Sequence, residues 1–324
     1  MELFKYKKPI PLMSKAKYFG LLSLSVVILS WVLIFTKGFN YGIDFAGGTL
    51  IQVKYDKKAP IKEIRAKLSS VKKYENASVT NFGSDKEIVI RTKSSSGNVD
   101  KDVGKEVANL LKGTGNLVIR RVDMVGPKIG SELREKGLKA TLFAIIGILI
   151  YLTFRFEWRF ALASVIALIH DVSIAMGAIA LLQVPFNLDI LAAILTILGY
   201  SLNDTIIVFD RIREGIVKMK SHFNLGEIID DSVTRTLSRT TLTSLTTFFV
   251  VFVLYLFGGE ILKGFSFTLL VGVVVGTYSS IFIASPVLMW LGFDVKGYKE
   301  ALAEKKKREM EKEKLRNQFE QGVV

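Results

Sequence analysis

The chain has 324 residues, of which 50% are hydrophobic, a mean hydropathy of +0.36, a net charge of +14 and no cysteine. This surplus of apolar residues is untypical of a soluble domain, and it falls into six blocks of about 16 to 27 residues, the pattern of a polytopic membrane protein. The composition therefore excludes an ordinary cytosolic enzyme. The missing cysteines exclude a disulfide scaffold, a thiolate zinc site and a cysteine nucleophile.

The six apolar blocks predict six transmembrane α-helices. Because a helix needs ~20 residues to cross ~30 Å of hydrocarbon, the second and fifth blocks are short and must borrow flanking residues. The blocks are 18–35, 138–154, 160–182, 190–209, 242–257 and 265–291. The expected parts of the chain are an N-terminal segment 1–17, a first helix 18–36, an outside domain 37–136, five further helices in 137–291 and a basic tail 292–324.

The distribution of positive charge predicts the orientation of these helices. Residues 1–17 hold five lysines and the tail from Lys296 holds nine basic residues, whereas the short loop 183–187 has no charge. Because Lys and Arg accumulate in cytoplasmic loops, both termini are expected in the cytoplasm and residues 37–136 on the outside. The basic excess is then mainly a consequence of topology, so nucleic-acid binding is not expected.

The outside domain has a readable order of elements. Alternating apolar residues predict strands, and apolar residues at helical spacing predict two helices. The resulting β-α-β-β-α-β order predicts an α+β, ferredoxin-like domain. No phosphate loop or metal-ligand spacing occurs in it, so a docking or support module is favoured, with direct substrate binding as the alternative. The expected strands are 49–55, 78–82, 87–92 and 117–122, and the expected helices are 61–71 and 99–111.

Ionisable side chains inside apolar helices cost at least ~2.5–3.5 kcal/mol in a membrane, so each is a candidate for function. Asp204 lies in the fourth block, five residues before Phe209, with Asn203 and Thr205 beside it. Burial disfavours the charged form of a carboxyl group, which makes Asp204 a candidate for proton exchange. The alternative is an interfacial aspartate that reaches the lipid headgroups.

A second polar pair, His170 and Asp171, lies in the middle of the third block. Adjacent side chains on a helix point ~100° apart, so the two cannot both face lipid cheaply. One interpretation is a second protonatable pair beside Asp204, and the other is a structural hydrogen bond between helices. Since His170 has no second histidine at ligand spacing, no metal site is expected, and no motif calls for a cofactor.

The fifth block begins with hydroxyl side chains that share one helical face. Such a stripe either conducts water or protons along a helix or holds helices together. Arg239, at its expected cytoplasmic mouth, keeps its charge and is expected to pair with Asp204 and tune it. The stripe consists of Thr240, Thr243, Ser244 and Thr247.

The sixth block contains a small-residue motif, Gly272-x-x-x-Gly276, followed by Ser280. Glycines at this spacing allow the backbones of two helices to approach closely. Packing inside the chain is favoured over a dimer interface.

Two glycine-rich stretches flank the outside domain. The first is Gly42-Ile-Asp-Phe-Ala-Gly-Gly48, with Asp44 and Gly47 inside it, and the second is Val125-Gly-Pro-Lys-Ile-Gly130, with Gly126 and Pro127. Both resemble signatures of the SecD/SecF family of protein-export membrane proteins. The stretches 155–159, 167–171, 199–205 and 236–241 resemble its SecF branch rather than its SecD branch. The resemblance covers nearly the whole chain.

The resemblance implies a function and a set of partners. Members of the SecF branch pair with SecD, giving twelve spans, and work with the SecYEG channel and often YajC in the bacterial plasma (inner) membrane. They belong to the resistance-nodulation-division superfamily of proton-coupled machines. They use the proton-motive force to help a preprotein finish crossing after the motor SecA has pushed it in. In the family, the aspartate that matches Asp204 and the arginine that matches Arg239 are tied to proton flow.

The interpretation is a non-enzymatic, proton-driven auxiliary subunit of protein secretion. One alternative is a proton-coupled half-transporter for a lipid or drug, which predicts a roomy apolar cleft in the outside domain. The other is a passive scaffold of the translocation channel, which predicts that Asp204→Asn is harmless.

Overall fold

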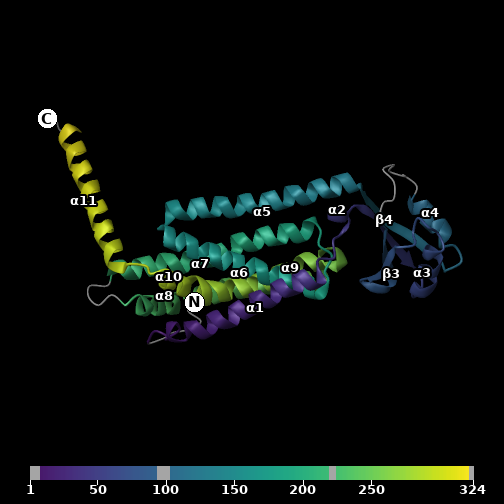
Figure 1. Ribbon diagram of the computed structural model, residues 1–324, viewed down its shortest axis with the longest axis horizontal. Coiled ribbons are helices and arrows are strands. Elements are labelled where there is room, and N and C mark those ends of the chain that lie inside the picture. The colour runs from purple at the N-terminus through teal and green to yellow at the C-terminus, as the bar shows by residue number, and fades with distance from the viewer. Residues whose placement is uncertain (1–7, 93–102, 219–223, 321–324) are drawn as a thin grey trace.

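The computed structural model describes residues 8–92, 103–218 and 224–320. Long helices lie side by side in a bundle, and a small sheet domain sits beyond one end of it (Figure 1). The first and last described residues lie toward the opposite end. We call the two ends of the bundle the domain end and the terminal end.

Six helical segments of the described chain are long and apolar enough to cross a membrane, which confirms the expected number. They are built from α1 (Ala16–Lys37) after a 3-10 turn (Met13–Lys15), α5 (Pro127–Arg155), α6 (Trp158–Leu182), α7 (Leu188–Lys218), α8 (Leu225–Phe257) and α9 (Gly259–Ser279) with its continuation. The helices α6, α7 and α9 form the buried middle of the bundle, while α1, α5 and α8 turn most of their apolar surface outward. Outward apolar faces of this kind suit a lipid environment.

The spanning helices are longer than the apolar blocks. The second and fifth take in flanking residues, as expected from their length. The helix α7 continues past Phe209 to Lys218, and its polar last turns are supported by pairs such as Lys218 Nζ–Glu214 Oε1 at 2.6 Å. Asp204 therefore lies near the middle of α7, and not close to its end as the apolar border suggested.

The last span is irregular near its end. The helix α9 passes into a π-helical turn (Ser280–Ala284) and then into α10 (Ser285–Trp290). Pro286 has no N–H group, and its ring clashes with the carbonyl group four residues earlier in a regular α-helix. The wider π turn accommodates this proline, and Ser285 Oγ donates to the carbonyl oxygen of Ser280 at 3.1 Å.

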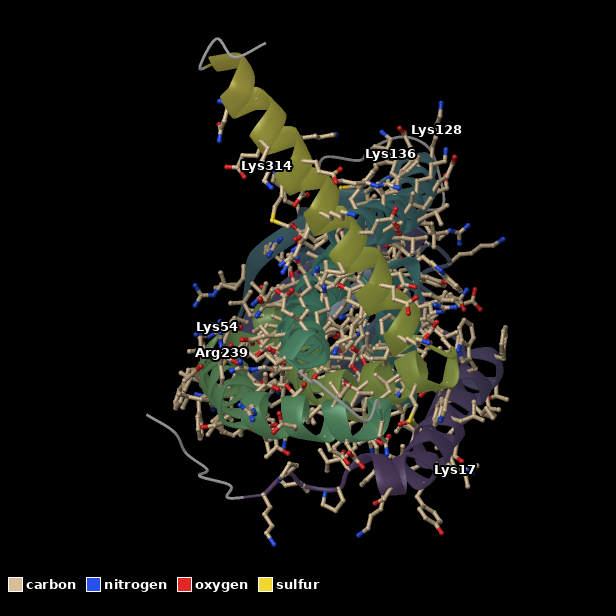
Figure 2. The ribbon with its side chains drawn as sticks, turned by 90° about the vertical axis from the view of Figure 1, so that its left-hand side faces the viewer. Lys17, Lys54, Lys128, Lys136, Arg239 and Lys314 are labelled. Atoms are coloured by element: carbon tan, nitrogen blue, oxygen red, sulfur yellow. The ribbon has the colours of Figure 1, made fainter. Side chains whose placement is uncertain are left out.

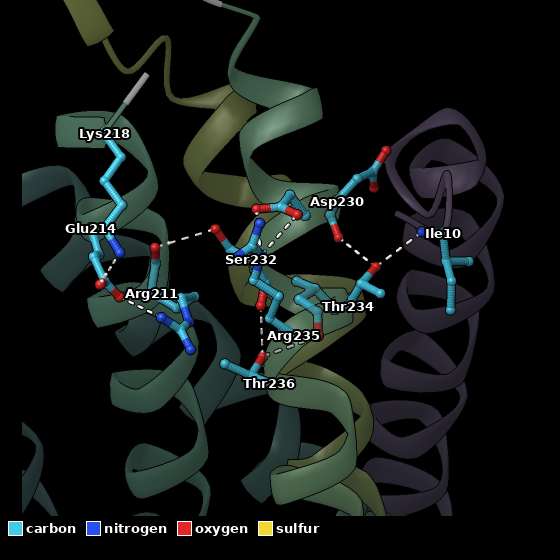
Figure 3. A network of polar contacts seen from close by, with 11 residues as sticks. Ile10, Arg211, Glu214, Lys218, Asp230, Ser232, Thr234, Arg235 and Thr236 are labelled. Carbon is cyan, nitrogen blue, oxygen red and sulfur yellow. Dashed lines mark hydrogen bonds and ion pairs between the residues drawn. The ribbon is translucent and has the colours of Figure 1, made fainter. Parts of the chain in front are cut away.

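At the terminal end, polar contacts fasten the start of the described chain to α8 (Figure 3). Thr234 Oγ1 accepts a hydrogen bond from the backbone N–H of Ile10 at 3.0 Å. Asp230 Oδ1 accepts from the backbone N–H of Met13 at 2.9 Å. Asp230 thus satisfies a free donor at the start of the first helix, which gives α1 a fixed position against α8.

The sheet domain has its elements in the expected order. They are β1 (Gly48–Tyr55), α3 (Ile61–Ser69), β2 (Ser78–Phe82), β3 (Ser84–Thr92), α4 (Val103–Leu110) and β4 (Leu117–Val125). The strands pair antiparallel in the order β2-β3-β1-β4. The expected start of the second helix, 99–102, lies outside the described residues. The strands β3 and β4 are each about three residues longer than their sequence patterns indicated.

The core of this domain lies on one face of the sheet. Ile51 and Val53 of β1 and Ile88 and Ile90 of β3 alternate toward α3 and α4, where they meet residues such as Ile64. Strand alternation places their neighbours on the other face. That face bears polar and charged side chains and is turned toward the bundle.

Two connections lead from the sheet to the bundle. The short helix α2 (Ile43–Ala46) links the end of α1 to β1, and α5 follows β4 directly. Because α5 begins at Pro127 and continues without a break to Arg155, the expected limit between domain and spans at 136–137 lies inside one helix.

The basic tail forms α11 (Val295–Glu320), which leaves the terminal end at a steep angle to the bundle (Figure 1) and crosses in front of it in the end-on view (Figure 2). Arg213 Nε donates to Tyr298 Oη at 3.0 Å, which ties its first turn to α7. Pairs such as Arg308–Glu304 at 2.6 Å support the exposed remainder.

Candidate functional site

Asp204 is the most deeply placed carboxylate of α7. Its side chain is 1% exposed. Ser244 Oγ of α8 donates to Asp204 Oδ2 at 3.2 Å. The other oxygen, Oδ1, is buried and has no hydrogen-bond partner within the described part of the chain. A buried oxygen with free acceptor capacity is a place where a proton can bind.

Behind Ser244, hydroxyl groups continue the cluster into α9. Thr277 Oγ1 lies 2.7 Å from Ser244 Oγ, so three helices meet through Asp204, Ser244 and Thr277. Thr240, one turn from Ser244, is also buried, and its hydroxyl group makes no hydrogen bond among the described residues. The cluster therefore has both a free acceptor and a free hydroxyl group.

Only half of the expected hydroxyl stripe belongs to this cluster. Thr240 and Ser244 are buried, whereas Thr243 is exposed. Thr243 Oγ1 donates to the carbonyl oxygen of Arg239 at 3.1 Å, and Thr247 Oγ1 donates to that of Thr243 at 3.0 Å. Thr243 and Thr247 thus bond their own helix, a usual choice for threonine in an apolar helix.

Arg239 and Asn203 lie away from the buried carboxylate. Both side chains are exposed, and Arg239 sits at the edge of the bundle in the end-on view (Figure 2). The expected pairing does not take the form of an ion pair, since none joins Arg239 to Asp204 in the described chain.

His170 and Asp171 form a second buried cluster. Although they are adjacent on α6, His170 Nδ1 lies 2.8 Å from Asp171 Oδ1. The other carboxylate oxygen accepts from Ser201 Oγ of α7 at 2.5 Å and from Ser279 Oγ of α9 at 2.7 Å. The imidazole ring stacks on Tyr278, and its Nε2 is buried with no partner among described residues.

The two clusters adjoin each other between α7 and α9. Ser201 precedes Asp204 by less than one turn of α7, and Thr277 and Ser279 are two residues apart on α9. Gly276 allows this closeness, because an added Cβ would stand 3.0 Å from Ser201 Cβ. Among the residues that the structure describes, no group of three or more His, Asp or Glu side chains is arranged to hold a metal ion.

The two glycine-rich stretches meet at the domain end. Gly47 has a φ of +72°, and a Cβ added to it would lie 2.7 Å from Pro127 Cα. A Cβ on Gly130 would lie 2.9 Å from the backbone N of Gly47. Gly126 caps the start of α5 in an extended conformation, and Gly48 opens β1. The first stretch is thereby packed tightly on the first turn of α5.

Comparison with known proteins decides the family. Residues 106–294 match the family model of the protein export membrane protein SecD/SecF C-terminal region, and residues 32–59 match that of the SecD/SecF GG motif. The chain belongs to the SecD/SecF family. The residues that match the C-terminal model include the five later spanning helices and both polar clusters. The residues that match the GG motif include the Gly42–Gly48 stretch with Asp44.

Relatives named protein translocase subunit SecF match this family member over most or all of their length. The protein of Helicobacter pylori strain J99 is 47% identical over 324 residues, which are 100% of both chains. That of Vibrio alginolyticus is 44% identical over 90% of this chain and 92% of its own. That of Escherichia coli O157:H7 is 41% identical over 84% of each.

Two solved structures share the fold. The translocon-associated membrane protein SecDF from Thermus thermophilus has a TM-score of 0.80 and 34% identity over 90% of this chain. SecDF in a super-membrane-facing form has a TM-score of 0.66 over 94% of this chain. This family member spans 40% and 41% of those two longer chains.

Sequence reasoning found the acids of both clusters but missed most of their hydroxyl partners. Ser201 could have been found from its position three residues before Asp204. Thr277 and Ser279 had the weaker signal of hydroxyl side chains in a strongly apolar span, which only the packing of α9 against α6, α7 and α8 makes specific.

Proposed function

We propose that this protein is a SecF-type subunit of a bacterial protein translocase that uses the proton-motive force, together with SecD, to promote preprotein translocation across the inner membrane. It catalyses no covalent reaction. The observation that carries the proposal is Asp204, a buried carboxylate in the middle of a spanning helix with one oxygen free and the other bonded to a hydroxyl group of a neighbouring helix. The full-length relatives named translocase subunit SecF support the same assignment.

Protonation of Asp204 changes how α7 is held. Hydrogen bonds to a charged carboxylate are about twice as strong as neutral ones, so proton uptake weakens the bond from Ser244. The contact between α7 and α8 then loosens, and proton release tightens it again. One proton moving down ~100 mV yields ~2.3 kcal/mol, which shifts a two-state equilibrium about fiftyfold. A large cycle therefore needs more than one proton or the help of a partner.

His170 and Asp171 are the candidates for a second proton. The free Nε2 supports this role, because an imidazole nitrogen without a partner can take up a proton. The alternative is a purely structural tie, which the bonds from Ser201 and Ser279 to Asp171 favour. In either role the pair lies on α6 and is bonded to α7 and α9, which are two of the three helices of the Asp204 cluster.

Arg239 acts in this proposal as a fixed positive charge that influences the proton site without an ion pair. Its guanidinium group cannot be deprotonated in practice, so it favours the charged form of a nearby carboxylate at all working pH values. Asn203, Thr243 and Thr247 have no direct part.

The terminal end is proposed to be cytoplasmic, which leaves the sheet domain outside. Arg155 ends α5, and Arg213 and Lys218 belong to the last turns of α7, so all three lie at the terminal end, and α11 adds more basic side chains. The loop between α6 and α7 at the domain end has no charge. The positive-inside rule connects the two observations.

Labelling of single cysteines tests this orientation, and the chain has no background cysteine. Ser70→Cys in the sheet domain and Lys218→Cys at the end of α7 both introduce exposed thiols. A membrane-impermeant maleimide applied to intact spheroplasts is expected to label position 70 and to label position 218 only after permeabilisation. Labelling of position 218 in intact spheroplasts would contradict the proposed orientation and place the terminal end outside.

The outside domain, 37–136, is proposed to be ferredoxin-like and to serve as a docking or support module. The β2-β3-β1-β4 order with both helices on one face supports the first point. Polar and charged side chains on its face toward the bundle, such as Gln52 and Arg121, support the second.

A half-transporter for a lipid or drug is the second reading of the same fold. A cavity of about 720 Å³ lies between the sheet and the bundle. Sites for apolar ligands are lined mostly by hydrophobic and aromatic side chains. The lining of this cavity is mixed, with apolar side chains such as Leu50 and Phe265 beside charged ones such as Arg91, Arg121 and Lys263. The charged share favours the translocase subunit over a site for an apolar ligand.

Copurification from native membrane tests the proposed assembly. Mild solubilisation and capture of a tag after α11 are expected to recover SecD in equal amount, with SecYEG and YajC in smaller amounts and a stalled preprotein when translocation is arrested. A tagged unrelated inner-membrane protein of similar abundance serves as the control. Recovery of the chain alone, or with no Sec component, would contradict the proposal.

A further inference from the structure

We infer that Asp44 is a positioning residue whose carboxylate ties the start of α7 to the root of the sheet domain, so that the domain follows α7. The inference rests on the proposed function, because α7 carries the proton site Asp204. It gives the acidic side chain of the Gly42–Gly48 stretch the role of a cap for the first turn of α7.

The contact itself joins two distant parts of the chain. Asp44 Oδ2 accepts a hydrogen bond from the backbone N–H of Leu188 at 3.0 Å, across 144 positions of sequence. Leu188 is the first residue of α7, whose first N–H groups have no partner inside the helix. Asn187 Oδ1 accepts from Ile190 N–H at 3.4 Å, so the local cap serves another donor and leaves that of Leu188 to Asp44.

The electrostatics of the helix end favour the same partner. The start of an α-helix has a partial positive charge, which a carboxylate stabilises. Asp44 is half-buried, although its bond to Leu188 lies at an exposed position.

Backbone pairing next to Asp44 holds the two segments in register. The N–H of Gly42 donates to the carbonyl oxygen of Phe186 at 2.8 Å, and the N–H of Phe186 donates to that of Asn40 at 2.7 Å. Asn40 Nδ2 donates to the carbonyl oxygen of Gln183 at 3.1 Å. The segments 40–44 and 183–188 therefore run parallel and are joined by backbone hydrogen bonds, and the bond from Leu188 to Asp44 is the last of these contacts.

The other side of the same segment is fixed to the domain. Asp44 belongs to α2, which leads directly into β1, and Gly47 is packed on Pro127 at the start of α5. Phe45, which is 5% exposed, packs against Phe186 in a tilted arrangement with ring centroids 5.6 Å apart. Figure 1 shows α2 at the junction of the sheet and the bundle. Asp44 is thus held in place by the segment that connects α1 to the sheet domain.

The link matters because α7 has no covalent connection to the sheet domain. The chain enters the domain from α1 and leaves it into α5. A shift of α7 caused by proton exchange at Asp204 must reach the domain through non-covalent contacts. The Asp44 bond at the first turn of α7 is one such contact, and the backbone pairs of Phe186 just before α7 reinforce it.

Three variants separate a cap from a general acidic charge. Asp44→Ala removes the acceptor. Asp44→Asn keeps an acceptor oxygen, and asparagine caps a helix about as well as aspartate. Asp189→Ala removes an exposed acidic side chain one residue into the same helix turn and leaves the cap in place.

Hydrogen exchange in the full complex, read by mass spectrometry, measures the contact. In Asp44→Ala, peptides that cover 186–194 and 38–48 are expected to exchange about fivefold faster than in the wild type, the size of a lost helix cap. Asp44→Asn and Asp189→Ala are expected to stay within twofold. Gradient-dependent secretion is expected to fall to the uncoupled level in Asp44→Ala alone, while copurification with partners persists.

Each other outcome overturns the inference. If hydrogen exchange of these peptides is unchanged in Asp44→Ala, the bond from Leu188 to Asp44 does not stabilise the start of α7. Faster exchange with full gradient-dependent secretion removes its role in coupling. A secretion defect of Asp44→Asn equal to that of Asp44→Ala points to a titrating carboxylate rather than a cap. Failure of the proposed function is seen separately, because Asp204→Asn in the same secretion assay tests it without reference to Asp44.

Discussion

Replacing Asp204 by asparagine is expected to abolish the part of protein secretion that depends on the proton gradient and to leave the ATP-driven part intact. Asparagine has nearly the same size and can still accept the bond from Ser244, so the packing of α7 on α8 persists. It cannot take up a proton. A buried carboxyl group where leucine would be cheaper by several kcal/mol is explained by that one ability.

Secretion of a reporter preprotein into inverted membrane vesicles, with ATP supplied and with or without an uncoupler, measures the effect. Asp210→Asn is the matched control, because Asp210 is on the same helix but forms an outer ion pair with Arg155 at 3.0 Å. The control is expected to secrete like the wild type. Full gradient-dependent secretion by Asp204→Asn would remove the proton-carrier role and leave the scaffold interpretation, with His170 and Asp171 as the remaining proton candidates.

Arg239→Met extends the same experiment to the charge outside the cluster. Methionine keeps a long apolar stem and removes the guanidinium group, which makes no ion pair with Asp204 in the described chain. If the charge tunes Asp204, the variant shows a partial to full loss of gradient-dependent secretion with normal assembly. Gradient-dependent secretion equal to that of the wild type would show that Arg239 does not tune Asp204, and the proton site would then consist of Asp204 and the buried hydroxyl groups alone.

Much of the fold could be predicted because its signals are local. Runs of apolar residues of spanning length give the six helices, and the alternation in strands such as Gly48–Tyr55 gives the sheet domain. The ends of the helices were harder to predict from the sequence. The helix α7 continues to Lys218 through a polar segment that hydropathy alone assigns to a loop, and this moves Asp204 from a helix end to a helix middle.

The candidate site was predicted only as far as the acids themselves. Asp204, His170 and Asp171 are conspicuous because acids and imidazoles are rare in spanning helices. Which neighbours face them depends on the rotation of each helix, and a stripe from Thr240 to Thr247 does not reveal that Thr243 turns outward. The cap by Asp44 depends on a contact across 144 positions of sequence, for which a single sequence has no local signal.

The close packing of α7 on α9 leads to the last prediction, that Gly272→Ala destabilises the bundle by about 1–3 kcal/mol, the usual cost of overpacking a filled core. A Cβ on Gly272 would overlap the side chain of Ile197, which is 1% exposed and branched near its root. The contact confirms that the Gly272 motif packs inside the chain. A lower apparent Tm of the purified protein in mild detergent is the expected result.

Two further variants decide whether lost space is the cause. Gly147→Ala on α5 adds the same methyl group where no atom lies within 4 Å, and alanine is the better helix former by about 1 kcal/mol, so its Tm is expected to hold or rise. Ile197→Ala in the Gly272→Ala background reopens the space. Because the two residues are in contact, their effects must be non-additive, with the double variant more stable than the sum of the single losses. If Gly272→Ala melts like Gly147→Ala, or if the double variant is additive, α7 and α9 do not meet as closely as these distances require, and the adjoining position of the Asp204 and Asp171 clusters loses its structural basis.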